Sequence, residues 1–198
     1  LAVDWIEVEG PLQAWPGVGY DRLFDKVPLK PTSVARAEAE GRTVPPQPKR
    51  NPDSYVYDPL VPAPTKPKED ATRLMKAFLP QAFRRPVSTE LQDYYVKIVH
   101  EALDKKKTFA EAMLLGYKTA LCSPHFLFIT ETLESTRKGG ATRLDDYALA
   151  TRLSYFLWSS LPDAELFQLA TKGELAKPEV VHAQVERMLK RLYEHRHA

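Results

Sequence analysis

One stretch of the chain, residues 72–134, limits the fold more than any other. It carries the only dense helical patterning before residue 144. Within it, residues 109–122 are apolar on almost every side, and a helix that is apolar all round is normally buried. We therefore expect a central helix at residues 108–122 with its neighbours packed around it. The side chains predicted to be nearly inaccessible are Phe78, Ile98, Leu114, Leu121 and Leu153.

Apolar residues at helical spacing, together with signals for helix ends, predict further helices around this centre. They are expected at residues 68–83, 89–105, 145–158, 162–173 and from 178 onward. Two starts have the spacing of a capping box: Thr89 with Gln92, and Thr108 with Glu111. The prediction is a mainly α fold, a small helical bundle of about six helices.

The N-terminal third differs in composition. β-forming residues alternate over residues 1–9, which predicts one N-terminal strand. Most of the 17 prolines lie in residues 13–67, where each fixes φ and removes a backbone donor. Large apolar side chains such as Tyr20 and Phe24 are rare in disordered linkers, the alternative for this region. We predict a Pro-rich strap, anchored by aromatic side chains, with one short helix near residues 34–41.

These patterns divide the chain into five segments. They are a terminal strand (1–12), the strap (13–67), a small helical domain (68–134), a linker (135–143) and the start of a second helical domain (144–198). We expect the whole to be a piece of a longer protein that needs its remaining polypeptide, or other protein chains, as partners.

Composition narrows the classes of partner. The net charge of +2 is too small to indicate nucleic acid. No run of 18 apolar residues occurs, so the sequence predicts no membrane span. The single cysteine, Cys122, excludes an internal disulfide and is interpreted as a buried apolar filler.

Few residues are candidates for chemistry. His125 could be an axial ligand or a proton carrier, although a histidine that bonds a backbone carbonyl explains it more simply. Arg84 and Arg85 could recognise a carboxylate or sulfate, or instead bond helix carbonyls and nearby acids. Trp158 is interpreted as a core or interface aromatic. Arg84, Arg85 and Trp158 are therefore the predicted interaction residues, and no catalytic residue is predicted.

Two other groups have a structural explanation. His182, His195 and His197 could clip a metal ion, but the last two belong to a basic terminus of the kind that usually frays. The acidic pairs Asp145 with Asp146, and Asp163 with Glu165, stand at expected helix starts, where carboxylates stabilise helices without any catalytic role. The sequence therefore predicts no metal site.

Four stretches carry a family resemblance. They are WIEVEGPL with a following WP (Trp5–Pro16), AFRRPVS (Ala82–Ser88), ALCSPHFLF (Ala120–Phe128) and RLSYFLWSSLPDAEL (Arg152–Leu166). Together they resemble the large secreted proteins that are abundant in planctomycetes. Those proteins contain several consecutive domains of unknown function, and many are fused to a c-type cytochrome domain.

The resemblance implies a setting rather than an active site. It implies that residues 1–12 end a β-sandwich, carbohydrate-binding-like domain, and hence a polysaccharide partner through that domain. It also implies a secreted, periplasmic or cell-surface location. No CxxCH motif occurs in the chain, so a haem c would be carried elsewhere in the parent protein.

Two functional hypotheses follow. The first is a non-catalytic helical scaffold or interaction segment of a secreted multidomain protein. The second is a part of a haem c-linked oxidoreductase or electron-transfer protein, with His125 or the arginines serving a haem outside this chain. The first depends on the lack of a catalytic constellation in the sequence, and the second on the resemblance.

Overall fold

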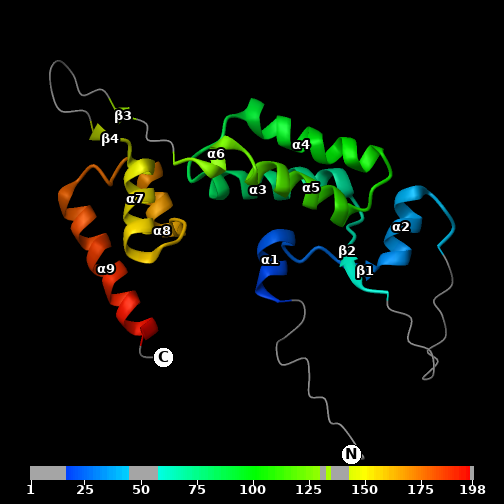
Figure 1. The fold of residues 1–198 in the computed structure, drawn as a ribbon, viewed down its shortest axis with the longest axis horizontal. Helices are drawn as coiled ribbons and strands as arrows, with labels where there is room; N and C mark the ends of the chain where they lie inside the picture. The colour runs from blue at the N-terminus through cyan, green and yellow to red at the C-terminus, as the bar shows by residue number, and fades with distance from the viewer. Residues whose placement is uncertain (1–16, 45–57, 130–132, 135–142, 197–198) are drawn as a thin grey trace, which may run out of the picture. The chain divides into compact units, whose positions relative to one another are not determined.

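The computed structural model describes residues 17–44, 58–129, 133–134 and 143–196 (Figure 1). These residues contain nine helices and four short strands, which confirms the mainly α prediction. The predicted strand at residues 1–9 lies outside them. The chain divides into two compact units, residues 1–74 with 98–115 and residues 75–97 with 116–198. Helices α3 (Pro67–Phe83), α4 (Thr89–Asp104) and α5 (Phe109–Leu121) contribute residues to both units.

The described part of the Pro-rich region belongs to the first unit and is folded. It contains α1 (Val18–Phe24), β1 (Leu29–Pro31), α2 (Thr32–Glu40) and β2 (Leu60–Pro62). The two strands pair antiparallel, with Leu29 opposite Pro62. The short helix is confirmed as α2, and Gly41 ends it with φ +70°, a conformation that glycine adopts without a steric penalty. Helix α1 and the strand pair are not predicted by the sequence.

Ion pairs join this region to helical residues of the same unit. Arg36 Nη2 lies 3.2 Å from Glu111 Oε1, and Arg73 bonds the Asp25 carboxylate. The Tyr20 hydroxyl donates to the carbonyl of Val27, a residue only 5% exposed. The region is therefore joined to these helical residues by polar contacts, and its predicted anchoring by aromatic side chains stays a prediction.

Three longer helices, α3 (Pro67–Phe83), α4 (Thr89–Asp104) and α5 (Phe109–Leu121), match the predicted ranges closely. The capping box at α5 is confirmed, because Thr108 N donates to Glu111 Oε2 at 2.9 Å and Glu111 N to Thr108 Oγ1 at 3.4 Å. The box predicted at α4 is wrong, because the Gln92 side chain donates from Nε2 to the carbonyl of Val87 at 2.9 Å. There, the N–H of Leu91 donates to Ser88 Oγ at 3.3 Å, so Ser88 caps the helix instead of Thr89.

The prediction that α5 is buried all round is wrong. Met113 is fully buried, but its neighbour Leu114 is 50% exposed and Leu121 is 37% exposed. The buried face is formed by Phe109, Ala112, Met113, Gly116, Tyr117 and Ala120. Three small residues on this face allow neighbouring backbones to approach closely. This face is therefore the packed side of α5, although the leucines of the helix lie on its other side. Phe78, Ile98 and Leu153 are only partly buried.

The rest of the second unit begins with α6 (Pro124–Leu127) and the pair β3 (Leu133–Glu134) and β4 (Arg143–Leu144). It continues with α7 (Asp146–Trp158), α8 (Ala164–Thr171) and α9 (Pro178–Arg196). Helices α8 and α9 both pack against α7 (Figure 1). The buried residues of this cluster are Ala150, Leu166, Ala170, Leu175 and Met188. Phe156 of α7 lies outside this cluster and is 85% exposed.

A pair of neighbouring substitutions tests which face of α5 is packed. Met113→Ala should lower the free energy of unfolding by about 2–5 kcal/mol, because it opens a cavity in the core. Leu114→Ala should change it by about 0.5 kcal/mol or less, as surface substitutions usually do. Urea unfolding followed by circular dichroism measures both. A larger loss for Leu114→Ala than for Met113→Ala would contradict this packing.

Candidate functional site

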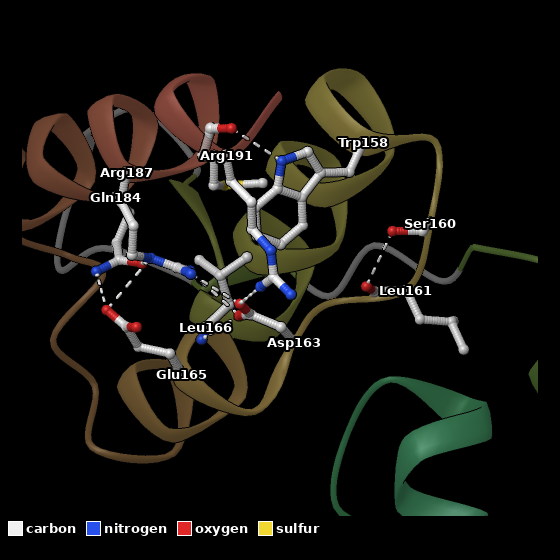
Figure 2. A network of polar contacts seen from close by, with 10 residues as sticks. Trp158, Ser160, Leu161, Asp163, Glu165, Leu166, Gln184, Arg187 and Arg191 are labelled. Carbon is white, nitrogen blue, oxygen red and sulfur yellow. Dashed lines mark hydrogen bonds and ion pairs between the residues drawn. The ribbon is translucent and has the colours of Figure 1, made fainter. Parts of the chain in front are cut away.

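The best-defined polar site of the chain surrounds Trp158, at the end of α7 (Figure 2). The indole Nε1 donates a hydrogen bond of 3.0 Å to the carbonyl oxygen of Met188 on α9. Met188 is fully buried, so this bond fixes the indole against the core of the helical cluster. The aromatic ring is therefore held in one place, and its outer face is available to other side chains.

Two guanidinium groups from α9 lie over this ring. The Cζ atoms of Arg187 and Arg191 are 5.4 and 5.5 Å from a Trp158 ring centroid. The arginines are four residues apart, so they lie on the same face of the helix. Both distances are within the range in which a cation is attracted to the π face of an indole. The site thus has an aromatic base with two cations on it.

The Asp163 carboxylate organises these cations. It accepts from Arg187 Nη1 at 2.8 Å and Nη2 at 3.2 Å, a forked pair, and it caps α8 by accepting from the N–H of Leu166 at 3.0 Å. Burial by itself would raise the pKa of Asp163. The hydrogen bonds from Arg187 and Leu166 and the charges of both arginines outweigh burial, and they hold this pKa below its ordinary value of 3.8.

The two arginines differ in how many of their N–H groups donate hydrogen bonds to other residues of the network. Arg187 also donates from Nε to Gln184 Oε1 at 2.8 Å, and Gln184 Nε2 in turn donates to Glu165 Oε1 at 2.8 Å (Figure 2). Arg191 has an ion pair with Asp163 at 3.9 Å, longer than a hydrogen bond, and its side chain is 56% exposed. Arg187 is therefore part of the framework, whereas Arg191 faces solvent.

A groove of about 340 Å³ opens beside this network. Its lining residues come from the end of α7, the α7–α8 loop and the end of α9, and they are Trp158, Ser160, Leu161, Asp163, Arg191 and Leu192. Leu161 is 41% exposed and Leu192 is 36% exposed. The groove therefore offers apolar walls next to one accessible cation, which suits an anionic group attached to an apolar one.

Arg84, one of the predicted interaction residues, is almost fully buried. It follows α3 with φ +60°, in the left-handed region where glycine is usual, and the N–H of Arg85 closes the helix end by donating to Pro80 O at 3.2 Å. Arg84 Nη2 donates to the carbonyl oxygens of His125, Phe126 and Phe128 at 3.3, 3.0 and 3.1 Å. Arg84 thus bonds the carbonyls at the end of α6, and a further binding role stays a prediction.

The neighbouring side chains are also engaged in structure. Arg85 Nη2 lies 3.5 Å from Asp145 Oδ2, and Asp145 caps α7 through a bond of 2.6 Å from the N–H of Ala148. Asp146 pairs with Arg143 at 2.7 Å. The predicted helix-start role of the acids is confirmed for Asp145 and Asp163. The predicted role of Arg85 as an interaction residue is not tested by this geometry.

His125 lies at the start of α6 and is exposed, with its ring stacked on Phe83 at a centroid distance of 5.3 Å. It borders a shallow groove of about 590 Å³. The other lining residues are Leu91, Tyr94, Tyr95, Lys118, Thr119, Cys122, Ser123 and Pro124. Cys122 is exposed, so its interpretation as a buried filler is wrong.

The remaining histidines give no metal site in the described residues. His182 Nδ1 lies 3.7 Å from Glu186 Oε1 at the surface of α9. The side chains of His195 and His197 lie outside the described part of the chain. Among described residues no group of three or more histidine, cysteine or acidic side chains could hold a metal ion, and no helix could cross a membrane.

Sequence reasoning identified Trp158 but missed Arg187 and Arg191, which complete its environment. A local signal was present, because two arginines four residues apart share one face of a helix. Their partner Asp163 lies 24 residues before Arg187 in the chain, at the N-cap of another helix. Helical spacing does not report contacts between helices, so the network could not be read from the pattern.

Two family models match parts of the chain. Residues 70–131 match PSD5, described as a protein of unknown function (DUF1595), and residues 144–197 match PSD4, also described as a protein of unknown function (DUF1592). Such domains of unknown function are typical of planctomycete-type multidomain proteins. No curated protein and no solved structure matches the chain.

The Asp163 network should make stability depend on acid pH. Because folding lowers the pKa of Asp163, its charge stabilises the fold above the ordinary value of 3.8, and this contribution is lost as pH falls through the lower folded value. Asp163→Asn removes the charge but keeps a good N-cap. The difference in urea midpoint between the two proteins should be constant above about pH 5 and shrink below about pH 4. A difference that persists unchanged at about pH 2 would contradict this role.

Proposed function

We propose that the chain is a non-catalytic helical scaffold or interaction segment of a secreted multidomain protein of unknown function. One observation carries this proposal. Leu127, Phe128 and Ile129 follow one another at the end of α6 and are 61%, 65% and 51% exposed. Three consecutive exposed apolar side chains form a patch of the kind that marks protein–protein contact.

The backbone of this patch is fixed rather than loose. The buried Arg84 guanidinium bonds the carbonyls of His125, Phe126 and Phe128, and its Cζ lies 5.7 Å from the ring centroid of Phe126. A segment that is ordered in advance loses less conformational entropy when it binds. The arginine thus holds the apolar patch in a defined shape, which supports a docking role.

The matched family models support the wider setting of the proposal. The partner would be the remainder of the chain's own polypeptide or another protein chain. A secreted, periplasmic or cell-surface location rests on the resemblance to planctomycete-type proteins. A polysaccharide partner rests on the resemblance of residues 1–12 to the last strand of a carbohydrate-binding-like domain, and those residues lie outside the described part.

A second candidate is a part of a haem c-linked oxidoreductase or electron-transfer protein, and the exposed imidazole of His125 favours it. A haem supplies one-electron transfer when bound. The residues here fit only a single contact to a haem that another part of the parent protein carries: the His125 ring is exposed, and one ring face lies against Phe83. Neutral imidazole is a good axial ligand.

The absorbance spectrum of the purified parent protein tests the haem candidate. If His125 is an axial ligand, His125→Ala should shift the Soret band and change the visible bands, because the ligand field of the iron changes. Thermal unfolding of the variant serves as the control for folding. An identical spectrum in a folded variant would rule this candidate out.

The scaffold proposal predicts association of the chain. At tens of micromolar, the 198-residue chain should associate in light scattering, because its apolar patch lacks the partner that would cover it. The double variant Leu127→Ser with Phe128→Ser should reduce this association strongly and leave the melting temperature nearly unchanged, since both side chains are exposed. A monomeric wild-type chain with a sharp cooperative melt would contradict the proposal.

A matched control separates the patch from general surface hydrophobicity. Val18, at the start of α1, is 69% exposed and stands apart from the patch in the sequence. Val18→Ser should leave association unchanged. An equal reduction by Val18→Ser would show that the association is non-specific.

A further inference from the structure

We propose that the groove beside Trp158 is a docking site for an acidic segment of a partner protein, in which a carboxylate side chain stands next to a large apolar one. This inference rests on the proposed interaction function and names the partner's chemistry at a second place on the chain. It follows from the charge, the walls and the rigidity of the groove.

Charge selects an anionic group. The lining contains one cation, Arg191, and one acid, Asp163. The forked pair with Arg187 already neutralises Asp163. Arg187 also pairs with Glu165 at 3.3 Å, so two acids face the two arginines. Arg191 is the more exposed of the two cations, at 56% against 27%, and Lys190 adds a further exposed cation next to it in the sequence. Glu165 and Glu194 are not part of the lining.

The donors of Arg191 are suited to a carboxylate. In the described part of the chain its closest acid is Asp163 at 3.9 Å, too far for a hydrogen bond. Contact with the indole holds the guanidinium 5.5 Å from a ring centroid. A planar guanidinium fixed in this way can form two parallel hydrogen bonds with an incoming carboxylate at a small cost in side-chain entropy.

The walls select an apolar neighbour for that carboxylate. Leu161 and Leu192 border the groove and remain 41% and 36% exposed. An aliphatic or aromatic side chain placed between them would remove both from water, which is favourable in proportion to the apolar area buried. The combination of one cation with two exposed leucines therefore matches an acidic residue adjacent to a large apolar one.

Shape favours a protein segment over a small molecule. The volume of about 340 Å³ is at the lower end for ligand pockets, which usually enclose most of the ligand surface. This groove is open to solvent along the ends of α7 and α9, so it can take side chains from a neighbouring backbone. The Trp158 bond to Met188 keeps the groove formed in the absence of a partner.

A titration followed by nuclear magnetic resonance tests the inference on the full chain. The reporter is the indole N–H signal of Trp158, assigned by its loss in Trp158→Phe. The probe is an acetylated and amidated hexapeptide of alternating leucine and glutamate, and its comparison is the same peptide with glutamine for glutamate. The acidic peptide should shift the signal with saturation in the millimolar range, and the glutamine peptide should bind about tenfold more weakly.

Two variants of adjacent residues separate a site from general electrostatics. Arg191→Gln should weaken binding of the acidic peptide by about tenfold, whereas Lys190→Gln, an equal loss of charge outside the lining, should change it by about twofold or less. Leu192→Ser should weaken binding without any change in charge. A single, well-resolved Trp158 signal and an unchanged thermal unfolding midpoint in the free variants show that the groove remains folded; the position of the signal itself changes in Arg191→Gln, because the guanidinium lies over the ring.

Three results would overturn the inference. They are an absence of any shift with the acidic peptide, an equal effect of Arg191→Gln and Lys190→Gln, and equal binding of the glutamine peptide. The light-scattering test of the α6 patch is independent of these measurements. If association through Leu127 and Phe128 occurs but the peptide does not bind, the inference about the groove fails and the proposed function stands.

Discussion

A single carboxylate, that of Asp163, holds together the polar side of the three C-terminal helices. It caps α8 through the N–H of Leu166 and bonds Arg187 of α9 in a forked pair. Arg187 in turn lies over Trp158 of α7. One acid therefore links α7, α8 and α9, and the position of Arg191 over the same indole follows from the helical repeat.

Arg84 is a second single side chain that links separate segments. A charged side chain is costly to bury unless its donors are satisfied, and here backbone carbonyls at the end of α6 satisfy them. The residue also accepts an unfavourable left-handed backbone conformation at the end of α3. In return, the hydrogen bonds of Arg84 fix the backbone at the end of α6. The exposed Leu127 and Phe128 at this end form the proposed interaction surface. The two candidate surfaces thus share one design, in which a buried polar contact orders a segment that presents apolar side chains.

Much of the local structure could be predicted from the sequence. The ranges of the main helices, the Thr108–Glu111 box, the glycine that ends α2 and the capping acids Asp145 and Asp163 all depend on residues close together in the chain. Local signals also failed where two neighbours compete for one role, as when Ser88 instead of Thr89 caps α4. The family resemblance located Trp158 and Arg84 within conspicuous stretches but assigned them no contact.

The sequence by itself determined that the chain is mainly helical and where the main helices lie to within a few residues, because capping and periodicity act over short distances; it did not indicate the short helices α1 and α6. Only the tertiary structure decided which face of α5 is packed, since the leucines of α5 lie on its exposed side and the small residues Ala112, Gly116 and Ala120 lie on the buried one. Tertiary structure alone also joined Asp163 to Arg187, placed Arg191 at the edge of a groove, and turned the Arg84 guanidinium inward. Each of these depends on helices meeting in space, and a one-dimensional pattern of hydrophobicity and charge does not encode which helices meet.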